Sequence, residues 1–350
     1  MSQCIDIDGR KVGYGNPCFF IAEAGVNHNG KTEMAKLLID VAQRAGADAV
    51  KFQTFNPEKL VSPGANKAEY QLQTTDRDET QMEMLQRLML HPESYRELQS
   101  YCRNKGILFI STPFDDQSAD FLADMAVPVF KISSGDINNW PFLEHVAGKG
   151  KPIILSTGMS RLSEVDEAVR VIRRSGCNQL LLLHCVSNYP AHPGDTNLRA
   201  MKTIKDAFQT PTGFSDHTPG NEVALAAVAM GACVIEKHFT LDKNLPGPDH
   251  RASLEPVELS ALVKGIRIVE SAMGSGLKEA AATEANTALS ARKSLFAAYD
   301  LPAGTVLTED MIAIRRPGDG LPPNMLSFVV KHTLRNEVKE GTILRLEMLS

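Results

Sequence analysis

Short apolar runs alternate with amphipathic segments over most of the chain. Segments with apolar residues three or four positions apart predict helices, the first at 31–45 and the last at 256–273. The runs between them each stop at polar residues and predict eight strands, at 18–23, 47–53, 106–112, 127–133, 152–156, 179–185, 211–215 and 232–238. This alternation predicts a closed (β/α)8 TIM barrel, an α/β fold. A doubly wound open sheet is the alternative, but no glycine-rich fingerprint follows the first strand.

Two stretches interrupt this pattern. Asp8-Gly9 lies between short apolar pieces and predicts a hairpin that caps one end of the barrel. Residues 54–80 are polar with little periodicity, and they are longer than an ordinary connection. We expect this insertion to be either functional or mobile.

The pattern changes again near the C-terminus. We expect the barrel domain, with its hairpin cap, to cover 1–280, a linker 281–289, and a small β-rich module 290–350. The module contains the pattern Gly-Thr-x-Leu-x-x-x-Met twice, ending at Met311 and at Met348. Such an internal repeat predicts two similar corners in one compact domain.

Composition narrows the classes of protein. The chain has 350 residues, 43% hydrophobic and 23% charged, with a net charge of −5, which gives no case for nucleic acid as a partner. No apolar run approaches the roughly 18 residues of a membrane span, and the start lacks the features of a secretory signal. The six cysteines lack CxxC spacing. We therefore expect reduced thiols in a cytoplasmic protein that binds neither membrane nor nucleic acid.

Candidate chemistry gathers where the predicted strands end, which is where barrels place their active sites. Ser215 with His217, and Glu236 with His238, are each two residues apart, so each pair shares a face. Two histidines on adjacent strands, with Glu23 nearby, predict a metal site with open positions for water and substrate. Ligands of nitrogen and oxygen favour Mn²⁺ or Mg²⁺ over structural zinc.

A second group of side chains suits an anion. Lys51 and Lys131 would neutralise a phosphate and a carboxylate, and serines in glycine-bearing loops would add donors: Ser134, Ser156 and Ser215. A structural alternative for Lys51 is an ion pair with Glu23 or Glu236. His250 is a candidate third metal ligand, although its glycine- and proline-rich loop makes Asp249 or His250 a better candidate for a sugar contact.

At these residues the sequence resembles the sialic acid synthase family, the bacterial nonulosonate synthases that condense phosphoenolpyruvate with an N-acetylated hexosamine. Residues 290–350, including Arg315-Arg316, resemble the antifreeze-like domain of that family. Each matching motif alone is weak evidence for the family, but together the motifs are highly specific. The barrel segments that match are 21–30, 45–53, 131–136, 155–159, 213–217, 236–242 and 247–250.

The resemblance implies a role for each matching residue. His217 and His238 would be the metal ligands, and Glu23 would lie beside the reacting carbons. The acceptor sugar would contact Gln53, Tyr189 and Asp249. The resemblance also implies a domain-swapped homodimer in which Arg316 reaches the partner's barrel. Phosphoenolpyruvate would be surrounded by Lys51, Thr112, Lys131, Ser134, Ser156 and Ser215.

The implied reaction joins phosphoenolpyruvate to open-chain N-acetylmannosamine, with C–O cleavage and release of phosphate, and gives N-acetylneuraminate. One departure concerns the acceptor. Where the sialic acid branch often has asparagine two residues before Tyr189, this chain has Ser187 followed by Asn188. This stretch is more similar to N,N'-diacetyllegionaminate synthases, so 2,4-diacetamido-2,4,6-trideoxymannose is the alternative acceptor, and both Ser187 and Asn188 are candidate contacts.

Two other readings stay open at this stage. One is another barrel enzyme, an aldolase or a 3-deoxy-sugar-phosphate synthase, since those also use lysines and metals. The other is a carbohydrate-binding protein with a relic barrel. The polar residues at every strand end argue against a relic.

Overall fold

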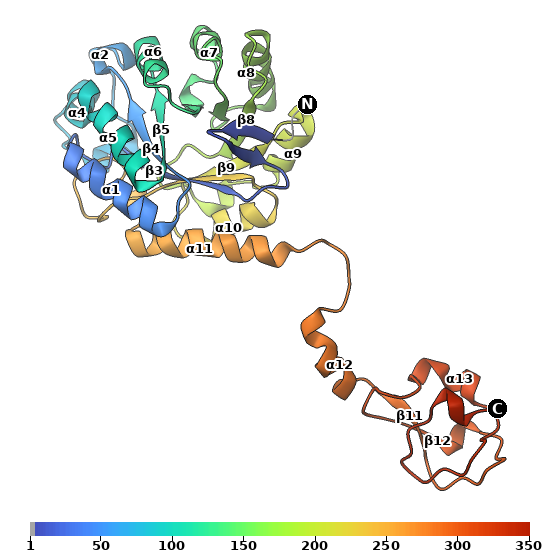
Figure 1. Ribbon diagram of the computed structural model, residues 1–350. Helices are drawn as coiled ribbons and strands as arrows, with labels where there is room; N and C mark the ends of the chain where they lie inside the picture. Colours follow the sequence, from blue (N-terminus) through green and yellow to red (C-terminus); the bar gives the residue numbers. More distant parts are fainter. Residues whose placement is uncertain (1–3) are drawn as a thin grey trace. The chain divides into compact units, whose positions relative to one another are not determined.

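The computed structural model describes residues 4–350 and divides the chain into two compact units. The first ends at Gly274, and the second is Ser275–Ser350. Figure 1 shows helices arranged around the strands of the first unit. The predicted TIM-like barrel with a small C-terminal β-rich domain is confirmed.

Eight parallel strands form the sheet of the first unit, in the order β5-β4-β3-β10-β9-β8-β7-β6. β5 and β6 also lie side by side, which brings the two edges of the sheet together. In residues 4–350 no backbone ladder joins those two edges. The strands are β3 (Phe19–Gly25), β4 (Ala49–Thr54), β5 (Leu108–Pro113), β6 (Phe130–Ile132), β7 (Ile153–Ser156), β8 (Leu180–Cys185), β9 (Thr212–Asp216) and β10 (Val234–His238).

Helices follow the strands as the apolar spacing predicts. They are α1 (Thr32–Ala45), α5 (Pro92–Lys105), α6 (Asp116–Asp124), α7 (Trp140–Ala147), α8 (Leu162–Arg174), α9 (Ala200–Phe208), α10 (Glu222–Ala229) and α11 (Pro256–Met273). Several strands begin one to three residues later than predicted, and β6 is shortened most. β6 begins only at Phe130, because Pro128 has no N–H for a strand ladder. α9 begins only at Ala200, because a separate 3-10 turn, η2 (Pro193–Asp195), precedes it.

The barrel interior is apolar at the end where the strands begin. Inward-facing residues of the strands, such as Phe19 and Ile154, form one buried cluster with Ile5, Ile7 and Val12. The last three come from the hairpin of β1 (Cys4–Ile7) and β2 (Arg10–Gly13). Because this cluster fills one end, polar side chains that point inward are confined to the other end of the strands.

The insertion after β4 contains three short helices, α2 (Pro57–Leu60), α3 (Glu69–Thr74) and α4 (Gln81–Leu88). Lys67 lies buried within it and donates to Thr75 Oγ1 at 3.1 Å and to the Asp76 carbonyl. The capping box of Thr80 and Glu83 starts α4. Internal hydrogen bonds thus order a stretch with little hydrophobic periodicity.

The second unit contains the antiparallel strands β11 (Ser294–Ala297) and β12 (Ile312–Arg315) and the short helix α13 (Leu326–Val329). Residues 281–289 hold the turn η4 (Ala282–Glu284) and most of α12 (Ala285–Ala291). The two copies of the repeated pattern have matching structures. Each glycine has a positive φ, 80° at Gly304 and 77° at Gly341, and each leucine, Leu307 and Leu344, is fully buried.

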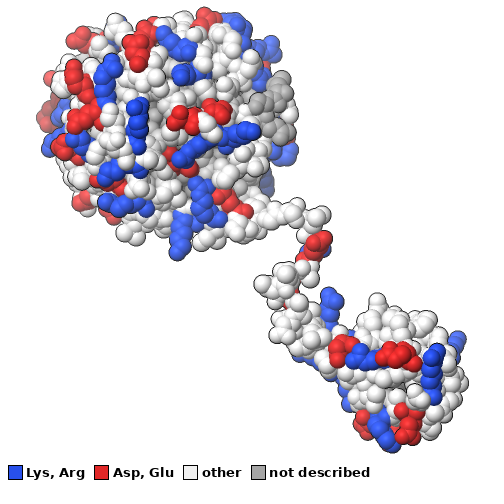
Figure 2. Space-filling view, viewed as in Figure 1, with Lys and Arg blue, Asp and Glu red and all other residues white. Residues whose placement is uncertain are grey.

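The surface carries charges of both signs. Figure 2 shows acidic and basic side chains interspersed on the face in view. None of the helices in the described part of the chain is long and apolar enough to cross a membrane.

Candidate active site

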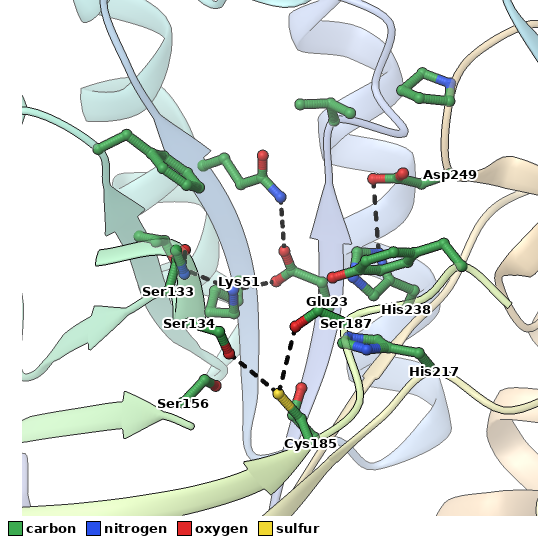
Figure 3. A pocket seen from close by; sticks show the side chains of 18 of the residues that line it. Glu23, Lys51, Ser133, Ser134, Ser156, Cys185, Ser187, His217, His238 and Asp249 are labelled. Atoms are coloured by element: carbon green, nitrogen blue, oxygen red, sulfur yellow. Dashed lines mark hydrogen bonds and ion pairs between the residues drawn. The ribbon is translucent and has the colours of Figure 1, made fainter. Parts of the chain in front are cut away.

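A cavity of about 460 Å³ opens at the carboxyl ends of the barrel strands. Its walls combine charged, hydroxyl and aromatic side chains from strands far apart in sequence (Figure 3). Thirteen of the residues predicted from the sequence line it: Glu23, Lys51, Gln53, Thr112, Lys131, Ser134, Ser156, Ser187, Tyr189, Ser215, His217, His238 and Asp249.

Three candidate residues do not line this cavity: Asn188, His250 and Arg316. Asn188 is exposed, whereas Ser187 and Tyr189 on either side of it line the wall. Asn188 therefore faces away from the wall that its two neighbours line. Arg316 belongs to the second unit, directly after β12, and is exposed there.

Two buried carboxylates and two buried lysines form the centre of the cavity. Lys51 Nζ lies 2.9 Å from Glu23 Oε2 and donates to Thr112 Oγ1 at 3.0 Å. Lys131 Nζ donates to Ser156 Oγ at 2.7 Å. Glu236 Oε1 lies 3.6 Å from both lysine nitrogens. The ion pairs considered as a structural alternative for Lys51 are therefore present, within a cluster that also reaches Lys131.

The two carboxylates differ in acidity. Burial raises the pKa of Glu23 to about 7, with Lys51 acting in the opposite direction. Burial also acts to raise the pKa of Glu236, but Lys131 and Lys51 outweigh it and hold that pKa below its usual range. Glu236 is thus a fixed anion near neutral pH, and Glu23 is the carboxylate whose protonation changes there.

The two histidines lie close together at the ends of β9 and β10, with their ring centres 5.5 Å apart, and His217 directly follows the last residue of β9. His217 lies at the end of β9, where its Nδ1 is 2.6 Å from the Val186 carbonyl. A proton on Nδ1 donates to that oxygen and leaves Nε2 as the acceptor. Burial lowers the pKa of both histidines, and the nearby His217 lowers the pKa of His238 further. Both rings are therefore neutral near pH 7, the form that binds metals.

These side chains fit a divalent ion with an incomplete protein shell. His238 Nδ1 is buried without a hydrogen-bond partner, and Asp249 Oδ2 lies 3.9 Å from it. In the described residues, no group of three or more His, Cys, Asp or Glu side chains forms a complete metal cluster. His250 does not serve as a third ligand, because its Nδ1 is 2.6 Å from Thr240 Oγ1 and the ring does not line the cavity.

Gly25 provides the space between these groups. Its φ is +54°, and a Cβ placed on it would lie 3.2 Å from Glu23 Oε1 and 3.5 Å from His238 Cε1. Gln53 Nε2 donates to the same oxygen of Glu23 at 3.3 Å. Any side chain at position 25 would therefore fill the space beside Glu23.

The insertion forms one wall of the cavity. The Tyr70 ring of α3 stacks on Tyr189 with centres 5.3 Å apart, and Tyr189 in turn lies 4.2 Å from the His217 ring. Thr74 Oγ1 donates to the Pro248 carbonyl, next to Asp249. The insertion therefore lines the candidate site, and a functional role for it stays a prediction.

Sequence reasoning missed several lining residues. Tyr70 follows no periodic pattern, so no signal marked it. Glu236 was predicted as a strand-end carboxylate and a possible partner of Lys51, but its second contact, with Lys131, was not predicted. Cys185 Sγ lies 3.1 Å from Ser134 Oγ, which accepts a hydrogen bond from Gly158 N at 2.9 Å. That serine is thus held by two neighbours that the sequence did not pair with it.

Residues 38–278 match the NeuB family, which is more than half of the chain. The chain belongs to the NeuB family. Residues 292–350 of this NeuB-family chain match the SAF domain. The family membership confirms the resemblance drawn from the motifs.

Three relatives of this NeuB-family chain show which activities have been assigned to similar proteins. It is 46% identical to an N,N'-diacetyllegionaminic acid synthase of Campylobacter jejuni over 93% of this chain and 98% of the relative. A synthase of the same name from Legionella pneumophila is 47% identical, with 93% of each chain covered. The solved N-acetylneuraminic acid synthetase of Leptospira borgpetersenii is 37% identical, with a TM-score of 0.72, covering 82% of this chain and 95% of that one.

Proposed function

We propose that this NeuB-family protein is a transferase that condenses phosphoenolpyruvate with the open-chain form of an N-acetylated hexosamine. The product is a nonulosonate, and phosphate is released. The observation that supports this best is the single cavity in which two lysines, several hydroxyl groups, two neutral histidines and Glu23 meet. All of these side chains line the same cavity, so together they can surround a small, doubly charged substrate.

The phosphoenolpyruvate would bind where the lysines and serines converge. Lys131 and Ser156 are already hydrogen-bonded, and Lys51 with Thr112 faces them across Glu236. Lysine ammonium groups and hydroxyl donors suit both the phosphate and the carboxylate. Ser134 and Ser215 lie along the same wall and would supply further hydrogen bonds.

His217 and His238 would hold Mn²⁺ or Mg²⁺, and the ion when bound would supply Lewis-acid polarisation of the acceptor's carbonyl group. The remaining steps concern the residues of this chain. C3 of phosphoenolpyruvate forms a bond to the aldehyde carbon, and positive charge develops at C2. Glu23, as an anion in a buried site, stabilises that charge and orients the water that adds to C2. One proton of that water passes to the alkoxide oxygen formed from the aldehyde. The C2–O bond of the phosphate ester then breaks as C2 becomes a ketone, the second proton leaves with the phosphate, and the lysines retain that phosphate.

The acceptor would lie between the aromatic wall and Asp249, in reach of Gln53 and Ser187. We place 2,4-diacetamido-2,4,6-trideoxymannose first as acceptor, because the two relatives at 46% and 47% identity are named as legionaminic acid synthases. N-acetylmannosamine is the second candidate, supported by the likeness to the solved N-acetylneuraminic acid synthetase.

Phosphate release from phosphoenolpyruvate, measured with each sugar in the presence of Mn²⁺, tests this assignment. We expect kcat/KM for the diacetamido sugar to exceed that for N-acetylmannosamine by about 100-fold, the scale at which one polar substituent is discriminated. A preference for N-acetylmannosamine would identify a sialic acid synthase. No sugar-dependent phosphate release with either acceptor would refute the proposed condensation.

We also propose a domain-swapped homodimer in which Arg316 of the partner subunit contacts the acceptor. Arg316 is exposed, and none of the ion pairs found within residues 4–350 includes it, so its guanidinium group is available to a ligand. The cavity, in turn, has no arginine among its lining residues.

Arg316→Ala should raise the KM for the sugar about tenfold while changing the KM for phosphoenolpyruvate by less than about threefold, as expected for one lost charge-assisted contact. Steady-state kinetics with each substrate varied in turn gives both values. Arg315→Ala is the matched control, because Arg315 is the adjacent exposed arginine. An unchanged sugar KM, or a monomer in light scattering, would count against this arrangement.

We place the reaction in the cytoplasm. The thiols of Cys18, Cys102, Cys177, Cys185 and Cys233 are buried and unpaired with one another, which suits a reducing compartment. Recovery of the protein from a secreted fraction would contradict this placement.

A further inference from the structure

A buried ion pair lies directly behind the two histidines of the cavity. Asp216 precedes His217 on β9, and Lys237 precedes His238 on β10. The two residues are opposite each other in the parallel pairing of these strands, and Lys237 Nζ lies 2.5 Å from Asp216 Oδ2. Neither side chain lines the cavity, because alternate residues of a strand point to opposite faces. Both are almost completely buried.

Each partner of this pair makes further bonds that bracket His217. Asp216 Oδ1 accepts from Thr218 N at 2.9 Å and from Thr218 Oγ1 at 2.7 Å. Lys237 Nζ also donates to the Thr218 carbonyl at 2.7 Å. The residues before and after His217 are therefore both fixed to the side chain that precedes His238.

A buried ion pair is a weak source of net stability, because desolvation offsets most of the attraction between the charges. Its geometric effect is stronger. Asp216 and Lys237 both bond to Thr218 as well as to each other, and these shared bonds restrict the separation of the two charges. Here that separation is between the two strand ends that present the imidazole rings.

We propose that Asp216 and Lys237 are positioning residues that set the distance and orientation of His217 and His238 for a divalent ion. The identity of the ion rests on the proposed function. The link between the strands, which we call the tether, is the Asp216–Lys237 ion pair with its bonds to Thr218, and it does not depend on that assignment. The pair acts from the outer face of the barrel, without touching substrate or metal.

The test uses the double variant Asp216→Asn/Lys237→Met in the full-length protein. Asparagine keeps an oxygen for Thr218, and methionine keeps the volume of the lysine stem, so only the tether is removed. Single variants are less informative, since each leaves one buried charge without its partner and destabilises the fold. Glu144→Gln/Arg174→Met is a control for the substitution chemistry, because it removes an exposed ion pair of the same 2.5 Å length between α7 and α8.

Mn²⁺ binding, followed by electron paramagnetic resonance without substrate, should weaken about tenfold or more in the Asp216/Lys237 variant, as for other residues that orient metal ligands. The dissociation constant for phosphoenolpyruvate should change by less than about threefold, because its proposed donors lie mostly on other strands. The control variant should match the wild type in both values. An unchanged Mn²⁺ affinity in the folded tether variant would overturn the proposal.

A crystal structure of the tether variant distinguishes failure of the positioning proposal from failure of the proposed metal site. If wild-type protein and His217→Ala/His238→Ala bind Mn²⁺ equally, the metal assignment fails, and the separation of the two rings decides the tether alone. A change of more than about 0.5 Å from the wild-type ring separation supports positioning, since functional groups are held within that tolerance. Retention of the 5.5 Å separation refutes it.

Discussion

Glu23→Gln is expected to lower kcat by at least about 100-fold, the usual cost of removing one preorganised electrostatic group from a buried site. The substitution keeps the size of the side chain and removes its charge at a position that is 1% exposed. The KM for phosphoenolpyruvate should change by less than about threefold, because Lys131, Ser156 and Thr112 remain in place. Rapid-quench measurement of a single turnover assigns the loss to chemistry.

The pH profile gives an independent check on Glu23. Its pKa is raised by burial to about 7, so the reactive anion is lost as the pH falls through that value. We expect kcat/KM of the wild type to fall about tenfold per pH unit below this point, as for loss of one ionised group. The residual activity of Glu23→Gln should lack this decline. Near-normal turnover of the variant would remove Glu23 from the mechanism.

Removal of divalent metal is expected to have the second large effect. Dialysis against EDTA should lower phosphate release by at least about 100-fold, and Mn²⁺ should restore it, because a bound cation contributes several kcal/mol to charge stabilisation in such reactions. Burial keeps the His217 and His238 rings neutral, so they are ready to bind the ion without losing protons.

Two histidine variants test whether the dependence of activity on metal comes from the site at His217 and His238. His238→Ala should not regain activity when Mn²⁺ is added at concentrations that restore the wild type. His192→Ala should behave as the wild type, because His192 is an exposed histidine in the loop before α9 and does not line the cavity. Full activity of the wild type in EDTA would defeat the metal assignment.

The barrel and the convergence of its strand ends were predictable because regular strands obey a simple rule. Alternate residues share a face, and the carboxyl ends of parallel strands meet at one rim. Lys51, Lys131 and His238 lie far apart in sequence, yet each could be placed at the cavity from its position at the end of an apolar run. The hairpin and the repeated glycine turns followed from equally local signals.

The unpredicted parts depend on geometry that no local pattern encodes. The contact of Glu236 with Lys131, in addition to the expected one with Lys51, depends on the strand order and register. Tyr70 reaches the cavity from an insertion ordered by scattered polar bonds and not by a hydrophobic face. Which of Ser187 and Asn188 faces the cavity depends on the path of the loop after β8, which no local pattern fixes, and the structure has Ser187 in the wall and Asn188 exposed.

The insertion wall has a consequence for how this family diversifies. The charged residues of the cavity lie at the ends of barrel strands, whose positions are fixed by the whole barrel. Most substitutions of these residues would therefore abolish the proposed reaction. Tyr70 and Gln71, by contrast, stand on a short helix outside the ring. Under the proposed function, substitutions in that helix would change the volume and shape of the acceptor site and leave the groups that form the bond in place. Relatives with the same reaction and different acceptor sugars are the expected result.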